Sequence, residues 1–252
     1  MSQTSAKKQK DNSSQYTNII GIDPSTTCTG LCVNGEMTAI MPRSHAETKK
    51  GALQKWVNIT SCHADIITVD NRPRSKVYSD EEILKLAYYR ELRDNIGRVI
   101  ESKDFIPTDT LVLIEGFSYE SAKGHLIDLV AFSTLLRNYL VEAGYNIQVI
   151  APSTLKMNTA KMAYEPTTVY LNKKKTRSKI EWRNPKGLSG GSFKKPDMMN
   201  AIIDSKYTDS KWKKFLQEHL SDLNDMKNVP KPIEDLNDAF LLYKVHKNGF
   251  SE

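Results

Sequence analysis

Cysteine is scarce in this sequence, and long hydrophobic runs are absent. Only three cysteines occur among 252 residues, too few for a disulfide framework, which predicts a reducing compartment. No apolar stretch approaches the roughly 20 residues that a helix needs to cross a bilayer. Residues 1–15 are rich in Ser, Gln and Lys and contain no apolar segment of the kind that a secretory signal carries. We therefore expect an intracellular protein without membrane contact.

The glycine spacing of a phosphate-binding P-loop is also absent, which argues against a Walker-type NTPase. Hydrophobic residues make up 39% of the chain, which is enough to bury a sizeable core. The polar composition of residues 1–15 predicts a disordered tail. We expect residues 16–252 to form one α/β domain.

Positive charge is concentrated in one segment. The net charge of the chain is +6, yet residues 172–195 contain nine basic side chains and one acidic side chain, so this segment carries +8 and the remainder −2. The basic residues are Lys173, Lys174, Lys175, Arg177, Lys179, Arg183, Lys186, Lys194 and Lys195. Because a basic patch gains free energy by releasing counterions from phosphates, the segment indicates a polyanion partner. The alternative is a solvated, disordered loop.

Hydrophobic patterning predicts that strands and helices alternate along the chain. Unbroken apolar runs predict buried strands, Asn34-Gly35 predicts a tight hairpin, and Ser79 followed by Glu82 is a capping-box pattern that starts a helix. The expected strands are 18–22, 29–33, 36–41, 66–70, 111–114 and 147–150, and the expected helices are 80–102, 122–142, 196–203, 210–220 and 232–247. The basic segment is expected to form a β-hairpin or a mobile arm.

Carboxylates follow two of the predicted buried strands and recur on the last predicted helix. Asp23 and Glu115 each end an apolar strand, and Asp235 and Asp238 lie three residues apart, on one face of a helix. If the two strands are neighbours and the helix packs beside them, these carboxylates meet. Such a cluster is costly unless cations occupy it, and oxygen ligands suit Mg²⁺ or Mn²⁺. The alternative for each residue alone is a turn, a cap or a solvated helix face.

These segments resemble the RuvC-type Holliday-junction resolvases of the ribonuclease H-like superfamily. Residues 20–30 (IGIDPSTTCTG) are similar to the family's opening strand, in which an Asp-Pro pair precedes a small-residue turn. Residues 113–117 (LIEGF) resemble the strand with the catalytic Glu, and residues 149–156 (VIAPSTLK) a strand followed by Pro-x-x-x-Lys. Residues 235–239 (DLNDA) resemble the terminal helix. The likeness covers most of residues 17–247, and the longer form is similar to phage or large-virus members.

The resemblance implies a ribonuclease H-like mixed five-stranded sheet flanked by helices, with a basic insertion at about 157–195, as a single nuclease domain over residues 16–252. It implies a metal-dependent endonuclease that resolves four-way DNA junctions by paired phosphodiester hydrolysis. The family's catalytic and metal-binding carboxylates carry over onto Asp23, Glu115, Asp235 and Asp238. The expected cofactor is Mg²⁺, which Mn²⁺ can replace, with two ions per site.

The resemblance also implies contacts to branched DNA by a homodimer. Lys195 is expected to stabilise the developing charge as a further catalytic residue. Phe117 or Tyr119 is expected to stack on an unpaired base, with ordinary core packing as the alternative. The other expected DNA-binding residues are Lys156, Lys173, Lys174, Lys175, Arg177, Lys179, Arg183, Lys186 and Lys194. The helix at 122–142 is expected to form part of the dimer contact. The protein is expected to be intracellular, with DNA, and cytoplasmic if bacterial or phage.

Three other functions stay open at this point. An actin-like or sugar-kinase-like ATPase also opens with a strand, an Asp and a Thr-rich turn, but it needs a second phosphate loop that has no match here. A non-catalytic DNA-binding relative would keep the fold without the activity, although all four carboxylates are present. A nuclease of broader range would cut forks or flaps as well as four-way junctions. No nucleotide cofactor is expected.

Overall fold

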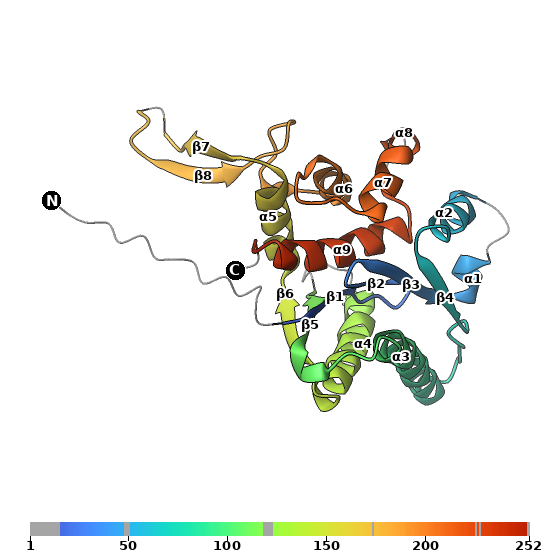
Figure 1. The fold of residues 1–252 in the computed structure, drawn as a ribbon. Coiled ribbons are helices and arrows are strands. Elements are labelled where there is room, and N and C mark those ends of the chain that lie inside the picture. Colours follow the sequence, from blue (N-terminus) through green and yellow to red (C-terminus); the bar gives the residue numbers. More distant parts are fainter. Residues whose placement is uncertain are drawn as a thin grey trace.

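A six-stranded mixed β-sheet forms the centre of the molecule (Figure 1). The computed structural model describes residues 16–47, 51–117, 123–172, 174–224, 226 and 228–250. The strands are β1 (Asn18–Asp23), β2 (Thr29–Val33), β3 (Glu36–Pro42), β4 (Asp65–Val69), β5 (Thr110–Glu115) and β6 (Asn146–Ile150), in the order β4-β3-β2-β1-β5-β6. β1 pairs antiparallel with β2 and parallel with β5. The carboxyl ends of β1 and β5 therefore lie at the same edge of the sheet.

The predicted mixed α/β sheet flanked by helices is confirmed. It has one strand more than the five that the resemblance implies, and all six strands that the hydrophobic pattern predicts, including the one at 66–70. The sixth strand is β4, which extends the sheet by pairing parallel with β3 from Thr38↔Asp65 to Pro42↔Val69. The predicted tail at residues 1–15 lies outside the described residues. β1, β2 and β5 are buried along almost their whole length, because helices cover both faces of the sheet. This double coverage explains why their sequences are unbroken apolar runs.

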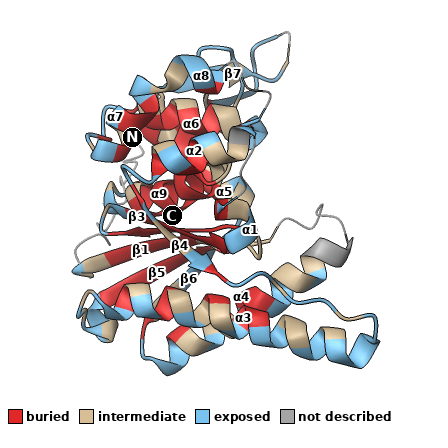
Figure 2. Ribbon diagram, turned by 90° about the vertical axis from the view of Figure 1, so that its right-hand side faces the viewer, coloured by how far each residue is buried: buried red, intermediate tan, exposed pale blue. Residues whose placement is uncertain are grey.

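Helices pack on both faces of the sheet, and buried residues gather between the layers (Figure 2). On one face lie α3 (Tyr78–Glu101) and α4 (Lys123–Glu142), and on the other lie α5 (Pro152–Ala163), α6 (Lys195–Asp204), α7 (Lys211–Glu218), α8 (Leu220–Asn224) and α9 (Ile233–Lys247). Two short helices, α1 (Arg43–Ala46) and α2 (Ala52–Thr60), connect β3 to β4. No helix in the described part of the chain combines the length and the apolar character that a membrane crossing requires.

The alternating side chains of β1 divide the core between the two layers. Ile20 and Ile22 pack with Leu92 of α3 and Phe132 of α4. Ile19 belongs to the other core, which contains the apolar residues of α9. Because successive side chains of a strand point to opposite faces, the strand is anchored from both sides, and the position of its last residue is well defined.

The predicted capping box at the start of α3 does not form. The helix begins at Tyr78, so Ser79 lies inside its first turn, and the residue before the helix, Val77, makes no side-chain cap. Glu82 pairs instead with Lys85, with 2.7 Å between Oε1 and Nζ. Glu81 contacts the preceding loop, where its Oε2 accepts from the backbone N–H of Ser75 at 2.8 Å. A charged side chain of the first helical turn thus binds the backbone of the preceding loop, and the expected cap is absent.

The basic segment contains an antiparallel hairpin that projects from the body of the molecule (Figure 1). Its strands are β7 (Pro166–Tyr170) and β8 (Ser178–Trp182). Of the two predicted alternatives, a β-hairpin or a mobile arm, the structure contains the β-hairpin. The first part of the predicted insertion, residues 157–163, belongs to helix α5, which packs against the short 3-10 helix η3 (Gly190–Ser192). The arm is therefore attached to the body at both ends.

Candidate metal centre

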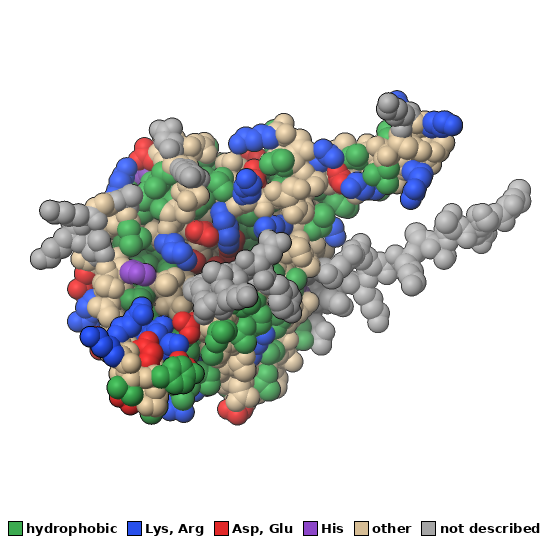
Figure 3. Space-filling view, turned by 180° about the vertical axis from the view of Figure 1, so that it is seen from behind, with side chains coloured by type: hydrophobic (Ala, Val, Ile, Leu, Met, Phe, Trp, Pro, Cys, Tyr) green, Lys and Arg blue, Asp and Glu red, His purple; other side chains and the backbone are tan. Residues whose placement is uncertain are grey.

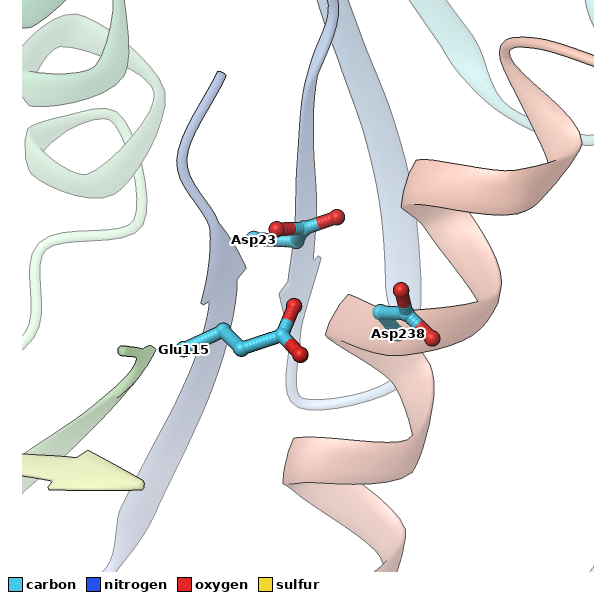
Figure 4. Close-up of side chains that lie close together, drawn as sticks. All are labelled: Asp23, Glu115 and Asp238. Atoms are coloured by element: carbon cyan, nitrogen blue, oxygen red, sulfur yellow. The ribbon is translucent and has the colours of Figure 1, made fainter. Parts of the chain in front are cut away.

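Three carboxylates meet where β1, β5 and α9 come together (Figure 4). Asp23 and Glu115 are the last residues of two parallel neighbouring strands, so both side chains leave the same edge of the sheet. Asp238 lies in the second turn of α9, which packs across β1 and β2. One carboxylate oxygen from each residue lies within 4.8 Å of the other two. The structure thus brings three of the four predicted carboxylates into one cluster.

Two glycines allow α9 to lie directly on the strands. A Cβ atom at Gly21 would be 2.1 Å from the carbonyl oxygen of Ala239, and one at Gly30 would be 2.2 Å from the carbonyl oxygen of Asp235. No side chain fits at either position without moving the helix backbone. These contacts therefore set how closely α9 approaches the sheet, and with it the position of Asp238.

The turn after Asp23 is held by hydroxyl groups. Thr29 Oγ1 donates to the carbonyl oxygen of Ser25 at 2.7 Å and accepts from the backbone N–H of Ser25 at 3.2 Å. The hydroxyl of Tyr88, in α3, donates to the carbonyl oxygen of Thr26 at 2.9 Å. These bonds tie the turn to β2 on one side and to α3 on the other. The small-residue turn thus supports the backbone from which Asp23 projects.

Each helix aspartate has a lysine partner. Lys195, the first residue of α6, forms an ion pair with Asp238. Lys231, which precedes α9, donates to Asp235 Oδ1 at 2.7 Å. Asp238 and Asp235 are only 1% and 3% exposed, and a buried carboxylate needs such a charged partner. Lys195 therefore joins the cluster through Asp238.

Asp235 lies beside the cluster rather than inside it. It is outside the group of three carboxylates whose oxygens lie within 4.8 Å, although its charge raises the pKa of Asp23. The buried thiol of Cys28 also contacts this carboxylate. The buried Oδ2 of Asp235 lies beside the cluster and accepts no hydrogen bond from an N–H or O–H donor among the described residues.

Sequence reasoning missed Lys231 and Glu234. Glu234 Oε1 lies 3.6 Å from Lys195 Nζ and adds a further negative charge near Asp238. Lys231 was detectable, because it stands four residues before Asp235, the spacing at which helical neighbours pair. Pro232, which stands between them, indicates the start of a helix, so Lys231 was not expected to pair with a residue inside it. Glu234 carries no comparable signal, since only the packing of α6 against α9 brings Lys195 to it.

Burial and mutual repulsion raise the pKa values of the clustered carboxyl groups. Burial, reinforced by Glu115 and Asp238, raises the pKa of Asp23 well above its ordinary value. Burial and the charge of Asp238 raise the pKa of Glu115 to about 7, although Lys195 opposes the shift. Burial also raises the pKa of Asp238, and Lys195 offsets part of this rise. One lysine therefore does not neutralise the three carboxylates.

The donor set fits a hard divalent cation. All three clustered ligands are carboxylates, the ligand type that Mg²⁺ and Mn²⁺ prefer. A divalent cation removes the repulsion between the carboxylates. The buried Oδ2 of Asp235 provides another oxygen beside them. A buried acidic cluster suited to a divalent metal is therefore present, and its three residues come from three separate parts of the chain.

The metal-free protein should lose stability as the pH rises from about 5 to 8. Glu115 has a pKa of about 7 in the fold against an ordinary value of 4.5, so the folded chain holds this proton more tightly than the unfolded chain. The resulting stabilisation is complete below pH 4.5 and is lost as the pH rises through 7. For Glu115 alone it amounts to about 3 kcal/mol.

Urea unfolding in chelator, at several values across this pH range, measures the effect. Glu115→Gln keeps the shape of the side chain and removes its titration, so the variant should show a flatter pH dependence than the native chain. If the native and variant proteins show the same pH dependence, Glu115 does not hold a proton in the fold as described.

The predicted DNA-binding residues fall into separate places. Lys194 is exposed and immediately precedes Lys195, next to the cluster, whereas Lys156 is half-buried in α5. Tyr119 and Lys173 lie outside the described residues. The remaining ones lie in or beside the β7–β8 hairpin: Lys174, Lys175, Arg177, Lys179, Arg183 and Lys186. The basic segment therefore contributes both the β7–β8 arm, which lies away from the carboxylate cluster, and Lys195, which pairs with Asp238.

Phe117 has an internal partner. The guanidinium carbon of Arg137, in α4, lies 4.7 Å from the centre of the Phe117 ring. The ring is partly buried, two residues beyond Glu115. One face of this ring thus has a cation from the same chain beside it.

No family model matches this chain, and no curated protein matches it. Among solved structures, the chain is similar to two of RuvC from Thermus thermophilus, one of them in complex with a Holliday junction substrate. Each shares 14% sequence identity, and the alignments cover 91% of this chain and 92% and 93% of the other chains, with a TM-score of 0.43. A likeness of this size identifies no activity, so the function has to follow from the residues of this chain.

Proposed function

We propose that this protein is a metal-dependent endonuclease that resolves four-way DNA junctions by paired phosphodiester hydrolysis. The observation that carries the proposal is the convergence of Asp23, Glu115 and Asp238, with carboxylate oxygens within 4.8 Å of one another. Such clusters hold the divalent ions used in phosphodiester hydrolysis. The positive charge of residues 172–195 supports a phosphate-rich substrate.

The carboxylates of the cluster would hold Mg²⁺ or Mn²⁺, with Asp235 as an adjacent fourth ligand, and the proposed number is two ions. When bound, the metal supplies a water of lowered pKa and neutralises charge at the phosphate. Lys231 offsets part of the rise that burial causes in the pKa of Asp235, so it helps to keep that carboxylate ionised.

Lys195 is the residue that we assign to the phosphate. Although burial opposes its charge, Asp238 and Glu115 raise the pKa of Lys195 above its ordinary value. The ammonium group therefore stays protonated at neutral pH. A cation held at this position stabilises negative charge that develops on a phosphate oxygen beside the cluster.

The proposal includes a homodimer, because a four-way junction has two-fold symmetry and paired cuts need two sites. Helix α4 remains our candidate for part of the contact. The exposed lysine and arginine side chains of the arm and Lys194 would contact DNA phosphates, which gives affinity with little sequence preference. A protein acting on such a substrate is expected to work inside the cell, with DNA.

Cleavage of a synthetic four-way junction, compared with a linear duplex of the same arms, tests the proposal. With Mg²⁺ or Mn²⁺ we expect paired, symmetric nicks in the junction, and with chelator we expect none. The duplex should stay intact under all conditions. Tight junction binding without cutting in either metal would indicate a non-catalytic relative. Absence of both binding and cutting would contradict the proposal and favour the alternative of an actin-like or sugar-kinase-like ATPase.

A further inference from the structure

The β7–β8 hairpin has two unlike faces. The register pairs Pro166 with Trp182, Thr168 with Ile180 and Tyr170 with Ser178. Because directly paired residues point to the same side of a sheet, these six form one face, here called the aromatic face. The opposite face contains Val169, Lys179 and Glu181 among others. The distribution of charge and of apolar groups differs sharply between the two.

The charges of the opposite face are already paired. Glu181 Oε1 lies 2.5 Å from Lys179 Nζ, and Glu181 Oε2 lies 2.6 Å from the guanidinium Nη2 of Arg183. Only 9% of Glu181 is exposed, since the two basic side chains cover it. This face therefore has a satisfied ionic network of its own, and the aromatic face is the side left for a partner.

The aromatic face presents apolar groups to solvent. Tyr170 is 52% exposed and Ile180 is 62% exposed, on an arm that projects from the body (Figure 1). Lysines accompany the rings: Lys175 Nζ lies 5.4 Å from the centre of Tyr170, and Lys161 Nζ lies 5.6 Å from the centre of Trp182. Figure 3 shows the same mixture from behind, with Lys and Arg side chains and hydrophobic side chains interspersed along the arm.

The aromatic face continues into a cavity at the base of the arm. Pro166 and Trp182 line this cavity of about 240 Å³ together with Lys161, Tyr164, Tyr207 and Phe250. The volume lies below the about 300–1,000 Å³ of typical small-molecule sites, which favours one flat ring over a whole nucleotide cofactor. Rings and lysines thus follow one another from the tip of the arm to its base.

The carboxylates around this cavity already have partners. Asp204 accepts a hydrogen bond from the hydroxyl of Tyr164 at 2.8 Å. Glu165 pairs with Lys206 at 3.0 Å, and Lys206 Nζ also lies 5.3 Å from the ring centre of Tyr207. Both carboxylates of the cavity are thereby engaged, and among the described residues Lys161 is the lining lysine that forms no ion pair.

We propose that the aromatic face and its cavity bind an unpaired DNA strand, a role that rests on the proposed function for its choice of DNA. Bases stack on Tyr170 and Trp182, one base enters the cavity, and Lys161 and Lys175 contact the phosphates. Proteins bind single-stranded nucleic acid with aromatic rings interspersed with cations, because each unpaired base offers a ring face for stacking. A base-paired duplex keeps these ring faces stacked inside. The positive charge of the arm complements the strand.

Tryptophan fluorescence tests this binding directly. Of the three tryptophans, Trp56 and Trp212 are only 1% and 2% exposed, so a nucleic acid that stacks on the protein quenches Trp182. Oligothymidylate titrated in chelator should quench the native protein, and the Trp182→Phe variant should show no quenching. Equal fluorescence of the native chain with and without the oligonucleotide would overturn the proposal.

A matched pair of double variants separates stacking from charge. Tyr170→Ser with Ile180→Ser alters two exposed side chains, so the fold should hold, and the affinity for oligothymidylate should fall at least about tenfold. The dependence of log Kd on log salt should stay unchanged. Lys161→Gln with Lys175→Gln should instead flatten that slope by about 1.4, because the two proposed phosphate contacts are lost.

Three results with the Tyr170→Ser, Ile180→Ser variant would contradict the proposed strand-binding role of the aromatic face. The variant could bind oligothymidylate as tightly as the native chain, or lose affinity for duplex DNA to the same extent. It could also lose self-association in sedimentation, which would make this face a contact between copies of the chain. Junction cleavage is measured separately. If oligothymidylate quenches the native protein but the protein cuts no junction, the proposed function fails and the strand-binding role of the aromatic face stands. If the native protein cuts junctions while the variant binds oligothymidylate normally, the strand-binding role fails and the proposed function stands.

Discussion

Asp23→Asn is expected to lower the rate of junction cleavage by more than about 10²-fold while junction binding stays within about threefold. Groups that merely orient metal ligands contribute about 10–100-fold to affinity or activity, and Asp23 is placed to be a ligand itself. The substitution keeps the shape of the side chain and exchanges one carboxylate oxygen for an amide nitrogen. Single-turnover cleavage with Mg²⁺ measures the first quantity, and fluorescence anisotropy in chelator measures the second.

The same variant should be no less stable than the native chain when metal is absent. Burial and the charges of Glu115, Asp238 and Asp235 raise the pKa of Asp23. These effects disfavour its ionised form, and the neutral amide of Asn does not carry that cost. A thermal melt in chelator checks this and separates a lost ligand from a lost fold. Asp209→Asn, an exchange at an exposed carboxylate, is the control and should cut at the native rate. Native-rate cleavage by Asp23→Asn would show that the site assignment is wrong.

Gly30→Ala is expected to destabilise the fold by about 3 kcal/mol and to lower cleavage further than the loss of folded protein explains. A Cβ at this position would lie 2.2 Å from the carbonyl oxygen of Asp235 and 2.5 Å from its carbonyl carbon. Overpacking costs about 1–3 kcal/mol, occasionally more, and here the obstacle is helix backbone, which cannot turn away as a side chain can. Helix α9 must move, and a displacement of about 1 Å at a catalytic group can cost about 10²-fold.

Urea unfolding measures the stability change, and cleavage per folded molecule measures the displacement. Gly191→Ala is the matched control, because its nearest atom beyond the chain neighbours would be Met157 Cε at 3.9 Å. That exchange should change stability by no more than about 0.5 kcal/mol. If Gly30→Ala is as stable and as active as the control, the close approach of α9 to β2 does not position the carboxylates.

The strands that carry the site were readable from local sequence. The unbroken apolar runs before Asp23 and Glu115 predicted two buried strands, and both end at those residues in the structure. The last helix was equally clear, since an apolar stretch follows Asp238 directly. Each of these patterns depends only on a few adjacent residues and their burial. The predicted strands and the predicted helix therefore form in the structure.

Local patterns failed where another group competes for the same side chain, or where strand register decides which residues share a face. The capping box of Ser79 and Glu82 does not form, because a loop residue engages Glu81 and a neighbouring lysine engages Glu82. The exposed rings of the arm were not singled out either. In the sequence Tyr170 and Ile180 are ten residues apart, and only the register of β7 with β8 places them on one face.

By itself, the sequence determined the buried strands, the terminal helix and the acidic residues at their ends, because apolar periodicity and burial are properties of neighbouring residues. The tertiary structure alone decided that Asp23, Glu115 and Asp238 form the cluster while Asp235 pairs with Lys231 beside it. That choice depends on how closely α9 lies on β1 and β2, a depth set by contacts between the glycines of one segment and the backbone of another more than 200 residues away.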